Sequence, residues 1–295
     1  MSKYTVKQID EMQLECTDPL AGMYKLSPYV WKERGIYKML IRAVNPASDV
    51  TQQAARVYYG TSKDGINFKM DDGPALAPGT NSFDKDGCED PSVIHFNKEY
   101  LVYYTGWNVT KREGQLMLAT GKNAQKLEVK KVAIASKAPY YNPKEATITQ
   151  LKNGRWALFF EYANDDRSKL GRAFSSKPDG PWKIEGEFLK AREESWDSYH
   201  VSAGPAVVNH LFQTVMFYNG SNPQAHWRIG WVEVDAHGTI TARSDDPLIT
   251  PPASRPGEVD IAFSASTVLV GKEIWLYYST EDAKPFRAII TVEDN

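Results

Sequence analysis

DPSVIHFNKEYLVYYTG, residues 90–106, contains two short apolar runs separated by a polar turn at residues 97–99. Four further stretches repeat this pattern, one of them with a single inserted residue. They are SPYVWKERGIYKMLIRA (27–43), EATITQLKNGRWALFFEY (145–162), GPAVVNHLFQTVMFYNG (204–220) and SASTVLVGKEIWLYYST (264–280). Each stretch predicts a β-hairpin, because β-branched and aromatic runs flank a turn.

The five hairpins are spaced evenly, at intervals of about 60 residues, so units of this size account for the whole chain. Further strand-like runs follow the hairpins, and no long stretch keeps the spacing of an amphipathic helix. Four strands per repeat indicate the blades of a β-propeller. We therefore predict an all-β, five-bladed β-propeller that forms one domain over residues 1–295, with four antiparallel strands in each blade. The alternative, a β-sandwich with accidental similarity between runs, is disfavoured by the even spacing.

The composition excludes several classes of protein. The net charge is −2 and the basic residues are scattered, so we expect no binding to nucleic acid or to an acidic membrane. No run approaches the length of a membrane span, and the first residues lack the pattern of a signal peptide, so a cytoplasmic location is expected. The oligomeric state is left open, with a homo-oligomer as one alternative. The aromatic content of 12% fits both β-structure and stacking on sugar rings.

Patterns typical of metal and cofactor sites are missing. The five histidines show no paired ligand spacing, and the two cysteines, Cys16 and Cys88, form no metal-binding or disulfide pattern. The chain has no glycine-rich dinucleotide motif, no P-loop and no GxSxG elbow. We therefore predict an activity that needs neither a metal nor a cofactor.

The repeat alignment indicates which residue each blade sends to the central axis. The aligned first residues are Ser27, Asp90, Glu145, Gly204 and Ser264. A structural requirement shared by all blades would recur in every copy, whereas only two of these five residues are carboxylates. We therefore predict that Asp90 and Glu145 are catalytic, with solvated turn acids as the alternative interpretation.

Carboxyl groups in a funnel rich in Trp and Tyr favour glycoside cleavage. One carboxyl group with a raised pKa protonates the departing oxygen, while another group activates water on the opposite face of the sugar. Crowding of Glu89, Asp90 and Glu145 keeps one of them protonated near neutral pH, because like charges disfavour joint ionisation.

Several short motifs together resemble glycoside hydrolase family 130, the β-mannoside phosphorylases and mannosidases, which are five-bladed propellers. GCEDPSV (87–93) is similar to the G-x-E-D-P-R motif of that family. The likeness continues over essentially the full chain, in LIRAV (40–44), WDSYHVSAGPAVV (196–208), RIGWVEVD (228–235), RSDDPLITPP (243–252) and IWLYYSTED (274–282). The resemblance implies a β-mannoside oligosaccharide as substrate.

The resemblance also implies roles for individual residues. Asp90 matches the general acid, which is proposed in that family to act through a sugar hydroxyl. Glu89, Asn45 and Asn219 would help to hold the sugar. Arg42 in LIRAV matches a basic residue of the family, and we expect it to contact the sugar or to pair with the acids.

Three basic residues of the phosphorylase pattern are replaced in this chain. Ser92 stands where the motif has Arg, His200 where a Lys is expected, and Asn219 where the family has His. Phosphate needs several charge-assisted donors, so water becomes the expected nucleophile. We predict an inverting hydrolase of β-mannosides or related small oligosaccharides, with Glu145 as the first candidate for the base. The next candidates for the base are Asp260, which is also expected to bind substrate, Glu258 and Glu194.

Two other functions stay open. The first is a β-mannoside phosphorylase that releases mannose 1-phosphate, and the second is a sugar-binding propeller without catalysis. A protein-interaction propeller is disfavoured, because it would not need acids confined to two blades.

Aromatic residues near the acids are the remaining candidates for substrate binding. Trp107 follows the second hairpin and is expected to be a sugar platform, while Tyr199 and His200 are expected to line the funnel. The other tryptophans are expected to pack between blades.

Overall fold

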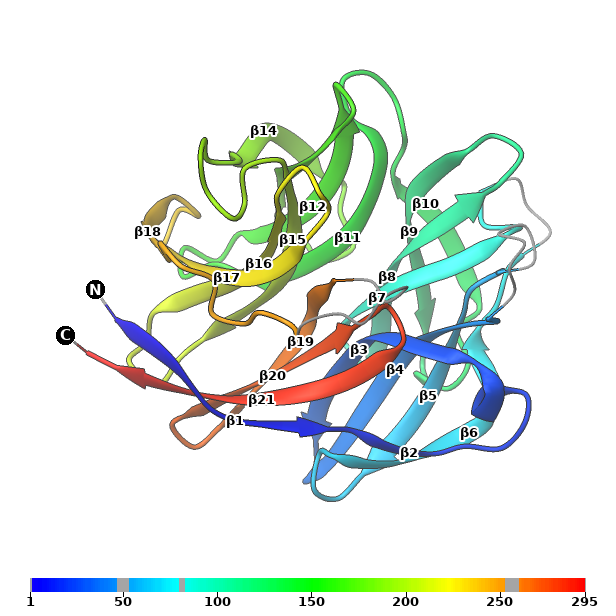
Figure 1. The fold of residues 1–295 in the computed structure, drawn as a ribbon. Coiled ribbons are helices and arrows are strands. Elements are labelled where there is room, and N and C mark those ends of the chain that lie inside the picture. The colour runs from blue at the N-terminus through cyan, green and yellow to red at the C-terminus, as the bar shows by residue number, and fades with distance from the viewer. Residues whose placement is uncertain (1, 47–52, 80–82, 253–259, 295) are drawn as a thin grey trace.

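The computed structural model describes residues 2–46, 53–79, 83–252 and 260–294. Its strands form five sheets arranged around a common centre (Figure 1). This arrangement confirms the predicted all-β five-bladed propeller. Within the described residues, no helix is long and apolar enough to cross a membrane.

Each blade is one sheet, whose strands follow one another from the outer edge to the axis. Blade 1 contains β2 (Gln13–Glu15), β6 (Asn67–Leu76), β5 (Arg56–Ser62), β4 (Ile36–Val44) and β3 (Tyr24–Glu33). Blade 2 contains β10 (Val129–Ile134), β9 (Glu113–Gly121), β8 (Glu99–Asn108) and β7 (Gly87–Phe96). Blade 3 contains β14 (Lys183–Leu189), β13 (Arg167–Ser175), β12 (Trp156–Asn164) and β11 (Tyr141–Gln150). Blade 4 contains β18 (Ile240–Arg243), β17 (Trp227–Val234), β16 (Thr214–Ser221) and β15 (His200–Val208). Blade 5 contains β1 (Lys3–Glu11), β21 (Lys284–Glu293), β20 (Glu273–Thr280) and β19 (Ala262–Val270).

The two ends of the chain meet in blade 5. Strand β1 pairs antiparallel with β21, from Lys3 opposite Glu293 to Glu11 opposite Phe286, and the termini lie side by side (Figure 1). The first strand of the chain therefore completes the last blade. Its pairing with β21 closes the ring of blades.

Blade 1 departs from the predicted four strands. After β1, the chain runs along the outer edge of blade 1, where Gln13–Glu15 pairs in parallel with residues 67–69 of β6. A short 3-10 helix at Leu20–Gly22 then leads into β3. The fifth, parallel strand arises because the segment from blade 5 to the axis of blade 1 passes this edge.

The hydrophobic core is divided into clusters between neighbouring blades. One joins blades 1 and 2 through Leu40 and Val102, and another joins blades 2 and 3 through Tyr103 and Phe160. Equivalent clusters join blades 3 and 4, blades 4 and 5, and blades 5 and 1. Middle strands such as β16 are buried on both faces, which explains why their sequences are continuous apolar runs.

The aligned positions of the five hairpins all lie at irregularities in the inner strands. The register shifts occur between Leu26 and Tyr29, Glu89 and Ser92, Lys144 and Thr147, Ala203 and Ala206, and Ser264 and Ser266. At Ser27, Asp90 and Glu145 the backbone is left-handed, with φ of 51°, 51° and 49°. A bulge re-aims side chains locally, and non-glycine residues rarely adopt this conformation, so these three positions are candidates for function.

Candidate functional site

The five aligned residues surround one point on the propeller axis. A small space of about 20 Å³ there is lined by residues that include Ser27, Asp90, Glu145, Gly204 and Ser264. It has the volume for one water molecule. Above it lies a cavity of about 710 Å³, whose floor includes Ser27, Asp90 and Glu145.

Gly204 lacks a side chain at the axis because there is no room for one. A Cβ at this position would lie 2.2 Å from the Phe217 carbonyl oxygen and 2.3 Å from Ser264 Oγ. Such contacts are far inside van der Waals distance. Packing between blades 4 and 5 therefore explains why the fourth repeat sends no functional group to the axis.

Asp90 and Glu145, here called the carboxyl pair, are hydrogen-bonded to each other. Ser27 Oγ donates to Asp90 Oδ1 at 2.7 Å, and Arg42 Nη1 lies 3.1 Å from the same oxygen. Burial raises the pKa of Asp90, but the Arg42 charge and two hydrogen bonds outweigh burial and leave this pKa below its ordinary value. Burial and the charges of Asp90 and Glu161 raise the pKa of Glu145 well above its ordinary value.

A hydrogen bond between two carboxyl groups requires a proton, and these environments favour the proton on Glu145. The direct contact also bears on the predicted role of Glu145 as a base. An acid and a base that act on opposite faces of a sugar stand several ångströms apart, with room for the substrate and a water. The two members of the carboxyl pair instead reach the cavity from the same side.

Arg42 connects the carboxyl pair to Glu89. Its Nη2 lies 3.0 Å from Glu89 Oε1, while Nη1 contacts Asp90. Burial and the negative charge of Asp90 raise the pKa of Glu89, although Arg42 opposes this. Three residues named from the motifs, Arg42, Glu89 and Asp90, therefore form one ion-paired group, in which Arg42 offsets the charge of two neighbouring acids.

A second ion pair on the cavity wall was not predicted. Lys144 Nζ lies 3.2 Å from Glu161 Oε1, which also accepts a hydrogen bond of 2.6 Å from Ser168 Oγ. Both Lys144 and Glu161 line the cavity. The repeat alignment contains the signal for Glu161, since it stands one residue before the end of its hairpin, as Arg42 does.

Blade 5 supplies two further acids that were not predicted individually. Glu281 and Asp282 follow β20 in the STED motif, have left-handed φ values of 55° and 48°, and line the cavity. Glu281 Oε2 lies 2.8 Å from Lys284 Nζ. Burial and the charge of Asp90 raise the pKa of Asp282, while Arg42 lowers it. Both acids fall just past the aligned hairpin, so the repeat comparison did not reach them.

The aromatic wall of the cavity comes from blades 4 and 5. Trp227 and Phe263 line the cavity, and their rings meet edge to face with centroids 5.3 Å apart. His200 stacks on Trp227 at 5.6 Å, and its Nδ1 accepts a hydrogen bond from the Ser168 backbone N–H. Burial lowers the pKa of His200, which favours a neutral ring. The sequence assigned Trp227 to inter-blade packing, whereas the structure places it on the cavity wall.

Other predicted residues lie outside the cavity lining. Trp107 is half-buried in β8 opposite Gly87, and Tyr199 lies under the Arg167 guanidinium, 4.7 Å from its ring centre. Asn45 is exposed just after β4, and Glu194 is exposed in the segment before β15. Glu258 lies outside the described residues. The predicted roles of these residues stay predictions.

Two predicted residues are fully engaged by the protein. Asn219 is buried, where its Nδ2 donates to the Ala203 carbonyl and its Oδ1 accepts from the backbone and hydroxyl of Ser264. Asp260 is held by both Nη atoms of Arg228, at 2.8 and 2.9 Å. These contacts assign Asn219 to the joint between blades 4 and 5. In Asp260, the negative charge of the carboxylate is already balanced by the Arg228 guanidinium.

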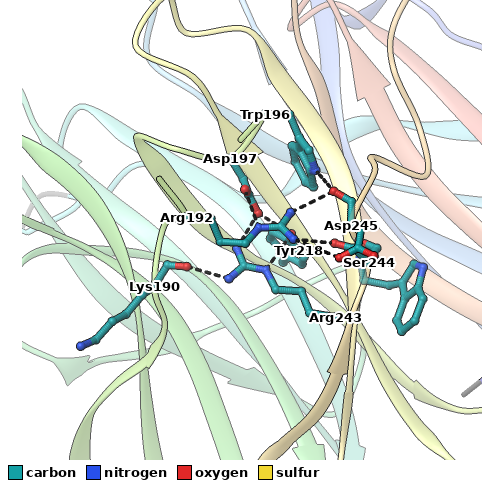
Figure 2. A network of polar contacts seen from close by, with 9 residues as sticks. Lys190, Arg192, Trp196, Asp197, Tyr218, Arg243, Ser244 and Asp245 are labelled. Carbon is teal, nitrogen blue, oxygen red and sulfur yellow. Dashed lines mark hydrogen bonds and ion pairs between the residues drawn. The ribbon is translucent and has the colours of Figure 1, made fainter. Parts of the chain in front are cut away.

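The WDSYH motif builds an anchor behind the funnel, here called the Asp197 cluster. Figure 2 shows Arg192 and Arg243 converging on Asp197, next to Tyr218. Arg192 Nε lies 3.0 Å from Asp197 Oδ1, and Tyr218 Oη donates to Oδ2 at 2.6 Å. Asp197 is fully buried and does not line the cavity. Among the described residues, no group of three or more His, Cys, Asp or Glu side chains could hold a metal ion.

Comparison with known proteins places this site in a family. The family model described as beta-1,4-mannooligosaccharide phosphorylase, glycoside hydrolase family 130, matches residues 32–293. A 1,2-beta-oligomannan phosphorylase of Thermoanaerobacter sp. (strain X514) is 24% identical over 270 residues, which cover 89% of this chain and 88% of that protein.

Solved structures share the fold. A beta-1,2-mannobiose phosphorylase from Listeria innocua superimposes with a TM-score of 0.75 at 16% identity, over 96% of this chain and 90% of that one. A second solved structure superimposes with a TM-score of 0.75 at 23% identity, and the match covers 90% of this chain and 84% of the chain in that structure. Its description says that the GH130 family of mannoside phosphorylases contains glycoside hydrolases that target beta-1,2 mannosidic linkages in Candida mannan. Because the family model covers nearly the whole propeller, this chain belongs to glycoside hydrolase family 130.

Proposed function

We propose that this protein is an enzyme that cleaves β-mannosides, and that it does so by hydrolysis. The observation that carries the proposal is the carboxyl pair at the floor of the 710 Å³ cavity. A buried acid that keeps its proton near neutral pH is the group that protonates a departing glycosidic oxygen. Family membership and the names of the relatives support a β-mannoside as the substrate.

The carboxyl pair acts as one proton donor in this proposal. Glu145 holds the proton beside Asp90, which remains ionised through Ser27 and Arg42. When the glycosidic bond breaks, Glu145 passes its proton to Asp90, and Asp90 passes a proton to the leaving oxygen, either directly or through a neighbouring sugar hydroxyl that gives its own proton to that oxygen. The pair thus donates one proton in each turnover and regains it from solvent.

The charges around the cavity support water over phosphate as the nucleophile. Three basic side chains of the described residues line it, Arg42, Lys144 and Lys284, and each lies within ion-pair distance of a carboxylate. His200 stacks on the lining residue Trp227 from outside the cavity lining, and burial lowers its pKa, which favours a neutral ring there. A phosphate dianion would therefore have to displace existing ion pairs in a cavity that already holds several acids.

Phosphorolysis is the second candidate, and the named relatives favour it. The family model is described as a phosphorylase, and so are both curated relatives from Thermoanaerobacter, at 24% and 22% identity. Arg42 and Lys144, which both line the cavity, would be the residues to hold phosphate, if it displaced their carboxylates. In that reaction the products would be mannose 1-phosphate and the shortened mannoside.

One experiment separates the candidates. The protein is incubated with β-1,2- and β-1,4-mannobiose, without phosphate and with added phosphate, and the products are separated by chromatography. We expect free mannose without phosphate, and we expect Asp90→Asn to lower the rate by about 10²–10⁴-fold.

As a control, Asp246→Asn alters an exposed residue after β18, outside the cavity lining, and should keep the parent rate. Mannose 1-phosphate formation with a strict phosphate requirement would establish phosphorolysis instead. Binding of mannobiose without turnover would reduce the protein to a sugar-binding propeller.

A further inference from the structure

Hydrolysis with inversion needs a base as well as an acid, and the carboxyl pair supplies only one of them. Inverting enzymes hold their acid and base roughly 6.5–9.5 Å apart, so that a water fits between the base and the sugar. Asp90 and Glu145 are in hydrogen-bond contact, on adjacent blades. The base must therefore stand elsewhere on the cavity wall, provided that the enzyme hydrolyses its substrate as proposed above.

Three carboxyl residues of the described chain line the cavity in addition to the pair: Glu161, Glu281 and Asp282. Glu161 is engaged by Lys144 and by the Ser168 hydroxyl. Glu281 is paired with Lys284. The side chain of Asp282 makes no hydrogen bond or ion pair at contact distance with a described residue, so its oxygens are available to a water.

The order of the blades places Asp282 across the funnel from the carboxyl pair. The hydrophobic clusters join blades 1 and 2, 2 and 3, 3 and 4, 4 and 5, and 5 and 1, which fixes the ring order. Asp90 belongs to blade 2 and Glu145 to blade 3, whereas Asp282 belongs to the loop between the two middle strands of blade 5. In a ring of five, the fifth blade faces the contact between the second and the third.

The surroundings of Asp282 suit a base that works near neutral pH. Its side chain is exposed to water and lines the cavity. Burial by this wall and the charge of Asp90 raise the pKa of Asp282, while Arg42 and Lys144 lower it. Lys284 and Glu281 on the same loop pair with each other, and their charges offset. A carboxylate with a moderately raised pKa accepts a proton more readily and is still ionised at the pH of the reaction.

We propose that Asp282 is the general base of hydrolysis. A water bound between Asp282 and the sugar attacks the anomeric carbon from the face opposite the leaving group. The new bond forms between the water oxygen and this carbon, and the proton of the water goes to the Asp282 carboxylate. The bond to the leaving oxygen breaks, its electron pair stays on that oxygen, and the proton donated by the carboxyl pair neutralises it.

The test uses Asp282→Asn, because Asn tolerates the left-handed backbone of this position and preserves the shape of the loop. Hydrolysis of an aryl β-mannoside is measured across pH without phosphate, for the parent, Asp282→Asn and the control Asp246→Asn. We expect Asp282→Asn to lose about 10²–10⁴-fold in kcat and to lose the acidic limb of the pH profile. Circular dichroism and thermal unfolding check that the variant is folded.

Azide provides the second measurement, because it is an anion that attacks carbon without giving up a proton. In Asp282→Asn, we expect azide to restore cleavage of the aryl mannoside and to form the α-mannosyl azide, the inverted product. Parent-like hydrolysis by folded Asp282→Asn, or a slow variant that azide does not rescue, would overturn the role of Asp282 as base. Failure of the parent itself to hydrolyse any mannoside would instead overturn the proposed hydrolysis, so the two failures are distinguishable.

Discussion

Two regions of this propeller bury carboxyl groups, and they compensate them differently. In the Asp197 cluster, two arginines and a tyrosine hydroxyl surround one carboxylate (Figure 2). Burial alone would raise the pKa of Asp197, but these partners hold it below its ordinary value. In the carboxyl pair, two acids share a single arginine, and the pKa of Glu145 rises well above its ordinary value.

The difference shows how to tell an anchor from a reactive group. A buried carboxylate that has several cationic or hydrogen-bonding partners stays ionised, and it joins the segments that carry those partners. Crowded acids with too few partners must retain a proton, which makes that proton available for chemistry. The Asp197 cluster ties the segment before β15 to strands β16 and β18, while the carboxyl pair faces the cavity.

Blade 2 contains a counterpart of the Asp197 cluster, which supports its role as an anchor. Asp84 is fully buried before β7, and it accepts hydrogen bonds of 2.8 Å from both Tyr104 and Lys130. In the repeat alignment Tyr104 corresponds to Tyr218. A device that recurs in two blades, away from the cavity, is best explained by the architecture.

The largest expected effect on stability comes from removing the charge at the centre of the anchor. Asp197→Ala removes a fully buried carboxylate and leaves the half-buried Arg192 and Arg243 without their partner, so we expect a loss of about 3–5 kcal/mol in the free energy of unfolding. Urea denaturation measures it. The folded fraction should keep the parent kcat, because Asp197 is outside the cavity. A large fall in kcat of the folded protein, without destabilisation, would erase the distinction between the two regions.

A smaller loss is expected from crowding the anchor instead of removing it. A Cβ at Gly220 would lie 2.5 Å from Asp197 Cβ and 2.8 Å from the Trp196 ring, so Gly220→Ala should cost about 1–3 kcal/mol. Gly73→Ala is the matched control, because no atom lies within 4 Å of a Cβ added there. Equal unfolding midpoints for the two variants would show that the segment before β15 adapts to the extra methyl group.

The smallest effect, and the one that sharpens the comparison most, is on the pH dependence of stability. Because the folded pKa of Glu145 is raised, the native state retains a proton that the unfolded state loses. The free energy of unfolding therefore falls as pH rises from the ordinary pKa of glutamate towards the raised one. Glu145→Gln should remove this fall, so the variant gains stability relative to the parent as pH rises from acid towards neutral.

Asp197 has the opposite sign. Its folded pKa is lowered, so its contribution to stability is present above the ordinary pKa of aspartate and is lost as pH falls from that value through the lowered folded pKa. Unfolding curves at a series of pH values for the parent, Glu145→Gln and Asp197→Asn test both signs. If Glu145→Gln and the parent showed parallel pH profiles, the raised pKa of Glu145 would be refuted.

The repeats in the sequence predicted the fold because the spacing of hairpins is a local property. Every blade contains two apolar inner strands and a turn, so each repeat carries this pattern in its own sequence, independently of the other repeats. The same alignment selected Asp90 and Glu145, since the axis receives the same position from each blade. It did not extend to β2, whose pairing depends on the route of the chain between two distant blades.

The sequence by itself determined the family of folds and the acids that meet on the axis. Only the tertiary structure decided that the two acids touch, that Asn219 is buried between blades, and that Asp282 of blade 5 lines the same cavity as the pair. Which residues share the cavity depends on the closure of the ring, which brings residues almost 200 positions apart to one funnel. Protonation follows from those contacts, because a carboxyl pKa depends on every charge and every buried surface around it.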